Sequence, residues 1–211
     1  MKNKKKSALC LLGIFFLWTA AICFVDVKAI GPQGSEVGFA GLNHFFHRLT
    51  GVHLSLYTLT DFLSLIPLGF IAGFALLGLV QWVSRKSLRK VDRSILVLGG
   101  FYLLVMAAYL AFERIALNYR PILIEGILEA SYPSSTTVLV LCVIPTAAMQ
   151  LNARIRHNTL RKWPLLFLKA FTLFMVGARA VSGVHWLTDI IGGILLSGAL
   201  VLLYAHFSQH E

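Results

Sequence analysis

Three residues near the C-terminal end have side-chain types that could carry out nucleophilic or acid–base chemistry. Arg179, His185 and Asp189 lie within a strongly apolar part of the sequence. Charged side chains at membrane depth are costly unless they pair or do chemistry, so such a cluster indicates a functional site. Asp189 follows His185 by four positions, which predicts that both lie on one helical face. An acid so placed can hold the imidazole in one tautomer and stabilise its cation, as a nucleophile requires.

A second group of polar residues precedes this cluster. Arg120 lies in a connection between apolar stretches, and Ser134, Ser135 and Thr136 open the next apolar stretch. Hydroxyl side chains at a helix start act as caps, and the free backbone N–H groups there form an anion site. The same run could also be an ordinary helix cap. Because arginine forks match phosphate oxygens, Arg120 and Arg179 together with these donors indicate phosphate binding and phosphoryl transfer.

The composition indicates that these residues belong to an integral membrane protein. Of 211 residues, 57% are hydrophobic and only 13% are charged. Six apolar stretches approach or exceed the length that a helix needs to cross a hydrocarbon core. They are residues 8–25, 59–83, 94–112, 136–151, 163–181 and 188–207. We therefore expect an all-α polytopic bundle of six transmembrane helices, forming a single domain over residues 1–211.

Basic residues collect in alternate connections between these stretches. Most of the 19 lysines and arginines lie before the first stretch, between the second and third, or between the fourth and fifth. They are Lys2, Lys4, Lys5, Lys6, Arg85, Lys86, Arg89, Lys90, Arg93, Arg154, Arg156, Arg161 and Lys162. Because such residues are retained in the cytoplasm, we predict cytoplasmic termini and an active site facing outward. Topology and anionic lipid head groups explain the net charge of +10 better than nucleic acid does.

The first stretch has an alternative interpretation as a secretory signal. A lysine-rich start and an apolar run precede Val27-Lys28-Ala29, which resembles a cleavage site. The length of the run and the lysine beside the supposed cut favour an uncleaved helix.

Residues 30–58 predict a further helix that does not span the membrane. Apolar side chains recur there at spacings of three and four, which is typical of a helix in the outer membrane interface. They are Phe39, Leu42, Phe45, Phe46 and Leu49. This helix could roof the site and select lipid tails, or it could be a packed structural helix. We expect structural roles for the histidines outside the cluster, which are His44, His47, His53, His157, His206 and His210.

Taken together, the polar residues between 113 and 189 resemble the motifs of the type 2 phosphatidic acid phosphatase superfamily. These are six-span lipid phosphatases that share a core with haloperoxidases. The family pattern is Lys, six residues, Arg-Pro; then Pro-Ser-Gly-His; then Ser-Arg, five residues, His, three residues, Asp. Here Arg120-Pro121 ends the first element and Pro133-Ser134 begins the second. Arg179, His185 and Asp189 reproduce the spacing of the third.

The resemblance implies a role for each matched residue. Arg120, Ser134 and Arg179 would bind the phosphate. His185 would attack phosphorus to form a phosphohistidine, and Asp189 would orient His185. No metal or other cofactor would be needed, and the three cysteines show no metal-ligand spacing.

Four positions depart from the family pattern. They are Glu113 for the lysine, Ser135 for the glycine, Ala178 for the serine, and Thr136 for the histidine that protonates the leaving group. Threonine cannot act as a general acid near neutral pH. Glu113 could replace that acid in a buried setting, or it could pair with Arg114 or Arg120.

The missing acid leads to a prediction about the substrate. General acid catalysis is worth roughly 10²- to 10⁴-fold when a poor leaving group must be protonated. An alkoxide needs that help, whereas a phosphate leaving from a diphosphate is already a stable anion. We therefore predict a lipid phosphatase or phosphotransferase of the bacterial inner membrane that favours an isoprenoid diphosphate over phosphatidic acid. The alternative is a noncatalytic member that binds or transports a lipid phosphate.

Overall fold

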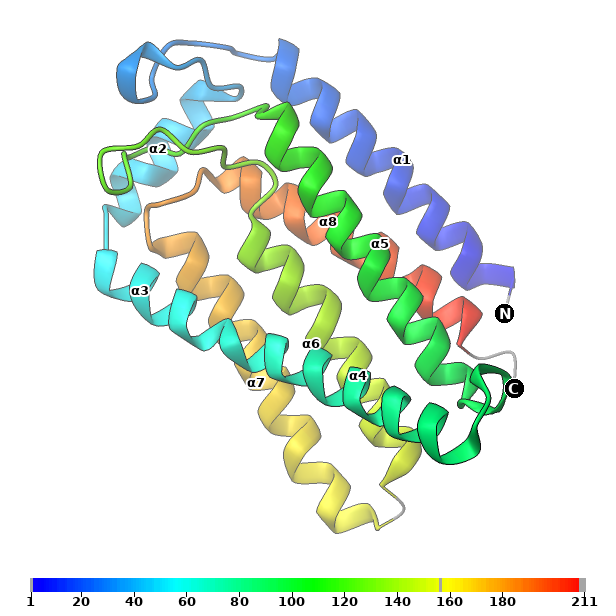
Figure 1. The fold of residues 1–211 in the computed structure, drawn as a ribbon. Helices are drawn as coiled ribbons and strands as arrows, with labels where there is room; N and C mark the ends of the chain where they lie inside the picture. The colour runs from blue at the N-terminus through cyan, green and yellow to red at the C-terminus, as the bar shows by residue number, and fades with distance from the viewer. Residues whose placement is uncertain (1, 156, 209–211) are drawn as a thin grey trace.

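The computed structural model describes residues 2–155 and 157–208, so the predictions for Arg156 and His210 fall outside the described residues. Within this part of the chain the regular elements are helices, and no sheet is present (Figure 1). The α-helices are α1 (Lys2–Phe24), α2 (Ala40–Thr50), α3 (Leu54–Leu63), α4 (Leu65–Arg85), α5 (Arg93–Ile115), α6 (Ser135–Arg154), α7 (Asn158–Val181) and α8 (Leu187–Phe207). Two short 3-10 helices, η1 (Pro32–Gly34) and η2 (Leu88–Lys90), lie in the connections.

Six segments of the described chain are long and apolar enough to cross a membrane, which confirms the predicted six-span helical fold. They are Asn3–Phe24, Leu54–Arg85, Arg93–Ile115, Ser135–Arg154, Leu160–Val181 and Leu187–Phe207. The second segment starts earlier than residue 59, where the sequence predicted it, because α3 and α4 follow each other directly at Ser64. The extra length matters for the site, since α3 packs against α7 and brings polar side chains to it.

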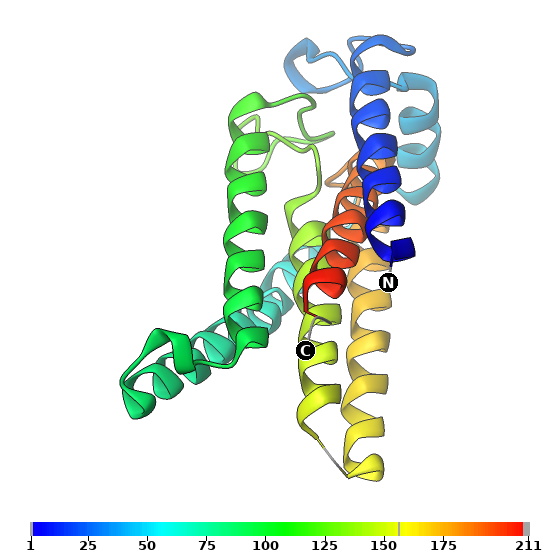
Figure 2. The ribbon, with the colours of Figure 1, turned by 90° about the vertical axis from the view of Figure 1, so that its right-hand side faces the viewer.

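The helices alternate in direction, so polar connections gather at two opposite ends of the bundle. The start of α1, the end of α8 and the η2 connection lie at one end, as do the end of α6 and the start of α7 (Figure 1). The segment with α2 and the long connection from α5 to α6 lie at the other end. A quarter turn shows α4 running obliquely to the other helices beneath α5 (Figure 2). Every residue of the predicted site is contributed near the end that carries α2.

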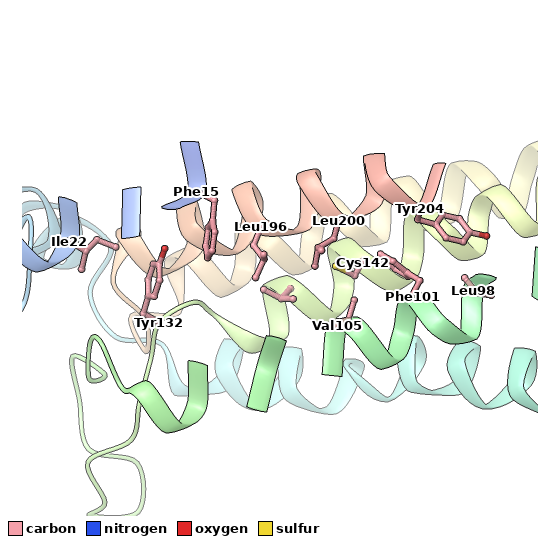
Figure 3. Packing of buried hydrophobic residues seen from close by; sticks show 11 residues of the cluster. Phe15, Ile22, Leu98, Phe101, Val105, Tyr132, Cys142, Leu196, Leu200 and Tyr204 are labelled. Atoms are coloured by element: carbon pink, nitrogen blue, oxygen red, sulfur yellow. The ribbon is translucent and has the colours of Figure 1, made fainter. Parts of the chain in front are cut away.

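The core lies between α1, α5, α6 and α8 (Figure 3). Phe15 of α1 and Leu196 of α8 meet there with Tyr132, which comes from the connection before α6. The Tyr132 hydroxyl lies 2.7 Å from that of Thr19, and Gly192 of α8 makes room for its ring. A Cβ on Gly192 would stand only 2.4 Å from a ring carbon of Tyr132. This packing fixes the segment that leads directly into Pro133-Ser134.

Candidate active site

His185 lies in the turn between α7 and α8, where a buried carboxylate lies beside its imidazole. Nδ1 of His185 lies 3.6 Å from Oδ2 of Asp189. The same oxygen accepts the backbone N–H of Trp186 at 2.9 Å, and Oδ1 accepts the side-chain amide of Asn118 at 3.3 Å. These bonds fix the carboxylate, which favours the tautomer with the proton on Nδ1. Nε2 then carries the lone pair of the ring, and the contact that the structure gives it is a long one from Arg120.

The sequence prediction that His185 and Asp189 share a helical face is wrong. α8 begins at Leu187, so His185 precedes the helix and Asp189 lies in its first turn. The carboxylate accepts the N–H of Trp186 and thereby caps the start of α8, where the helix dipole also favours an anion. The contact between histidine and acid therefore runs across a turn.

Arg120 faces the Nε2 side of the imidazole. Its Nη1 lies 3.5 Å from Nε2 of His185, and its Nε lies 2.9 Å from Oε2 of Glu129. The hypothesis that Glu113 pairs with Arg114 or Arg120 is therefore wrong, because Glu129 takes that place and Glu113 forms no ion pair with a described residue. Glu113 is exposed near the end of α5, but it lines the same cavity as His185.

Arg179 is held by α3, the helix at the start of the second span. Its Nη1 donates to the hydroxyl of Thr60 at 3.1 Å, and its Nη2 lies 4.0 Å from Oδ1 of Asp61. The guanidinium carbon of Arg179 lies 4.7 Å from the centroid of the Tyr57 ring, and that of Arg120 lies 5.8 Å from the same centroid. Such cation–π contacts stabilise arginines that lie close to each other. Tyr57 therefore links the two cations.

The start of α6 brings the predicted hydroxyl run to the turn that carries His185. The backbone N–H of Ser134 donates to the carbonyl oxygen of Asp189 at 3.1 Å. The Ser134 hydroxyl is buried and accepts a bond from Thr137 at 3.0 Å. Ser135 and Thr136 line the cavity, and the first N–H groups of α6 have no acceptor within their own helix. The hydrogen bond between Ser134 and Asp189 thus joins the second and third motifs of the family pattern.

A cavity of about 830 Å³ opens beside these residues, between α3–α4, α5 and α6. One end is polar and includes Arg120, Thr136 and His185. The other end is apolar and includes Leu68 and Val143. This arrangement suits a molecule that carries an anionic group on a hydrophobic chain.

The surroundings of His185 keep its side chain neutral. Burial lowers the pKa of His185 from its ordinary value of 6.5 to about 4. The charges of Arg120 and Arg179 act in the same direction, whereas Asp189 opposes them. Because the imidazole is unprotonated at neutral pH, its lone pair is available for attack.

The structure adds polar residues that sequence reasoning did not place in the site. They are Tyr57, Thr60, Asp61, Asn118 and Glu129, all of which contact one of the predicted residues. Glu129 and Asn118 lie in the same connection as Arg120, so proximity in the sequence was a usable signal. The signal on α3 was an acid, Asp61, inside an apolar stretch.

Two comparisons with known proteins found similarity to this chain. Residues 118–211 match the model of the PAP2 superfamily, and this part of the chain contains Arg120, Ser134, Arg179, His185 and Asp189. A solved structure with a similar fold is that of a transmembrane PAP2-type phosphatidylglycerolphosphate phosphatase from Bacillus subtilis. The TM-score is 0.63 at 19% sequence identity, and the match covers 95% of this chain and 94% of the other. No curated protein sequence matches the chain.

Proposed function

We propose that the chain is a membrane phosphatase of the PAP2 superfamily, whose model matches residues 118–211, and that it hydrolyses a phosphate or diphosphate on a lipid through a phosphohistidine at His185. The observation that carries this proposal is the approach of Arg120 Nη1 to within 3.5 Å of His185 Nε2. A cation beside the lone pair of a neutral imidazole is the arrangement that attack on an anionic phosphorus requires. The buried Nε of Arg179 has no hydrogen-bond partner among the described residues, and a phosphate oxygen would supply one.

The first step transfers the phosphoryl group to histidine. Nε2 of His185 attacks phosphorus in line with the leaving oxygen, so that a P–N bond forms while the P–O bond to the lipid breaks. Arg120, Arg179 and Ser134 bind the other phosphate oxygens, together with Ser135 and the first N–H groups of α6. Asp189 stabilises the positive charge that develops on the imidazole. The lipid leaves with the electron pair of the broken bond.

The second step releases phosphate. A water molecule attacks phosphorus from the side that the lipid has left, the P–N bond breaks, and His185 regains its lone pair. The proton of the water passes to solvent. An acceptor other than water, admitted to the same cavity, would make the enzyme a phosphotransferase.

The residue at position 136 supports a preference among leaving groups. Thr136 is buried and lines the cavity where the family places an acid histidine, so no imidazole at that position protonates the departing oxygen. A phosphate that leaves from an isoprenoid diphosphate is a stable anion without protonation, whereas the alkoxide from phosphatidic acid is not. We therefore favour an isoprenoid diphosphate as the substrate. Glu113 lines the cavity as well, and it remains the candidate for a substitute acid.

The first experiment measures phosphate release by the purified protein in detergent from a polyprenyl diphosphate and from phosphatidic acid. We expect faster release from the diphosphate, and no release by His185→Ala or His185→Gln. Thermal unfolding of both variants checks that they are folded. Faster turnover of phosphatidic acid would overturn the substrate preference. Binding of a lipid phosphate without release of inorganic phosphate would favour the alternative, a noncatalytic binding or transport protein. The specific argument for this alternative is that Thr136 stands where the family has an acid.

The role of position 136 has its own test. Thr136→His restores an acid, and Thr136→Asn is a control that enlarges the side chain without supplying one. We expect Thr136→His to raise turnover of phosphatidic acid relative to the diphosphate by about tenfold or more. An equal change in both variants would show that position 136 acts through its size.

We also propose that the termini are cytoplasmic and that the site faces outward. The start of α1, the η2 connection and the α6–α7 connection carry the basic clusters, and they share one end of the bundle (Figure 1). Retention of such clusters in the cytoplasm supports this orientation. The phosphate would then be released on the outer side of the plasma membrane.

A further inference from the structure

Helix α2 turns an apolar face away from the protein. Leu42, Phe45 and Leu49 are 42%, 66% and 71% exposed, and their spacing of three and four residues places them on one side of the helix. Asn43, by contrast, is completely buried. A soluble protein would have the opposite arrangement, with apolar residues inside. The outward face of α2 therefore fits a hydrocarbon environment at the edge of the membrane.

The inward face of α2 is fixed to the turn that carries His185. The side-chain amide of Asn43 donates to the Thr188 hydroxyl at 3.0 Å, and its carbonyl oxygen accepts the Thr188 backbone N–H at 3.2 Å. The Nε2–H of His47, in the tautomer that this contact requires, donates to the carbonyl oxygen of Gly183 at 3.1 Å. These bonds settle which side of α2 points outward. They also connect α2 to both flanks of His185.

A basic groove of about 520 Å³ lies between α2 and the segment before it. Its polar lining is Lys28, His44 and Arg48, and Phe45 and Leu49 form part of its apolar lining. Lys28 pairs with Asp26 at 2.8 Å. The side chains of His44 and Arg48 are exposed, and neither side chain forms a hydrogen bond or ion pair with a described residue. A guanidinium without a protein partner beside exposed apolar side chains matches a phosphate that carries acyl chains.

We propose that this groove binds the head group of an anionic phospholipid, and that α2 is thereby held in the outer membrane interface. Arg48 and His44 contact the phosphate of the head group, and the acyl chains run along Phe45 and Leu49. This site is separate from the substrate cavity, with which it shares no lining residue. Because α2 bonds to Gly183 and Thr188, lipid binding also steadies the turn around His185. The binding does not depend on the proposed reaction, whereas the effect on turnover rests on it.

Lipid binding can be measured without any activity. The purified full chain in a neutral detergent is titrated with phosphatidylglycerol or phosphatidylcholine, and bound lipid is counted by native mass spectrometry. The test variant is His44→Gln/Arg48→Gln. The control is Arg114→Gln, which removes an exposed arginine from the end of α5 and leaves the groove intact. Millimolar inorganic phosphate in a parallel series separates lipid binding from binding of a free anion.

We expect the unaltered protein and Arg114→Gln to prefer phosphatidylglycerol, with or without inorganic phosphate. Loss of one cationic group near an anionic lipid weakens binding on the order of fivefold, so the double variant should lose most of this preference. Equal binding by the double variant and Arg114→Gln would overturn the proposal. Displacement of the lipid by inorganic phosphate would do the same, because it would indicate a site for free anions.

A second measurement tests the position of α2. A fluorophore on Phe45→Cys, in a background with Cys10→Ser and Cys23→Ser, is reconstituted into vesicles of phosphatidylcholine with phosphatidylglycerol. We expect quenching by doxyl-labelled lipid and protection from aqueous iodide, whereas the reverse would overturn the proposal. Turnover in the same vesicles should rise with phosphatidylglycerol in the unaltered protein and not in His44→Gln/Arg48→Gln. If no variant turns over substrate, the proposed function fails, while the binding results still decide this proposal.

Discussion

The chemical state of His185 is set by neighbours that the tertiary structure brings together. Burial and two arginine charges keep the imidazole neutral, and Asp189 lies on its Nδ1 side. A neutral imidazole with its Nδ1 side next to a carboxylate is the state that the proposed attack on phosphorus requires. The same environment has a consequence for stability that can be measured.

We predict that the protein loses stability through His185 as the pH falls from about 6.5 to about 4. In this window the unfolded chain binds a proton at His185 that the folded site excludes. The contribution of the neutral His185 to the free energy of unfolding is therefore complete above pH 6.5 and is lost as the pH falls. One pKa unit corresponds to about 1.4 kcal/mol, which gives a loss of about 3 kcal/mol over the window. Thermal unfolding in detergent from pH 7 to pH 4 measures it, with His185→Gln as the control. Parallel pH profiles for the two proteins would contradict the prediction.

At the scale of the elements, α8 is the surface on which the site is assembled. Its first turn holds Asp189, its next turn admits Tyr132 at Gly192, and Ser134 bonds to the Asp189 carbonyl oxygen. Gly193 lies beside Thr137, so a second glycine allows the start of α6 to approach. Glycines in a helix cost stability, and here they permit close contact between two motifs.

We predict opposite effects of two alanine substitutions in α8. Gly192→Ala places a methyl group 2.4 Å from the Tyr132 ring and should destabilise the protein by about 1–3 kcal/mol. Gly198→Ala meets only Leu11, at an ordinary 3.5 Å, and should stabilise the helix by up to about 1 kcal/mol. Thermal unfolding and phosphate release compare the two variants. Gly192→Ala should also lower turnover, because Tyr132 precedes Pro133 and Ser134. Similar behaviour of both variants would show that the contact at Gly192 is unimportant.

At the scale of the whole molecule, the two ends of the bundle carry different kinds of residue. One end carries the basic clusters, and the other carries α2, the long connection before α6 and the turn with His185 (Figure 1). The cavity extends from the second end along α4 and α5 toward the apolar middle of the bundle. A lipid substrate could therefore keep its chain at membrane depth while its phosphate reaches the surface.

The proposed orientation predicts which exposed positions react with an impermeant reagent on intact cells. Glu125→Cys, in the connection before α6, should be labelled by a membrane-impermeant maleimide. Lys86→Cys, in the η2 connection, should react only after the membrane is permeabilised. Both are made with Cys10→Ser and Cys23→Ser, since these two cysteines are exposed, whereas Cys142 is buried. The reverse pattern of labelling would place the site in the cytoplasm.

The sequence by itself was sufficient for the features that depend on local composition and short spacing. Whether a segment can span the membrane depends on the hydropathy of about 20 consecutive residues. The hydropathy of the sequence therefore predicted the bounds of all six candidate spans to within a few positions. Arg179, His185 and Asp189 lie close together along the chain, and their spacing alone indicated a site. The match of residues 118–211 to the PAP2 superfamily agrees with the resemblance drawn from those motifs.

Only the tertiary structure decided which distant residues meet. The Thr60 hydroxyl accepts a hydrogen bond from Arg179, which lies 119 positions later in the sequence. Glu129 rather than Glu113 pairs with Arg120. Hydropathy could not predict either contact, because it records how apolar a helix is and not which neighbour it packs against. The outward face of α2 was also undecided, since its apolar spacing fits a packed helix as well as an interfacial one. The bonds between the buried Asn43 and Thr188 of α8 show which side of α2 faces the protein.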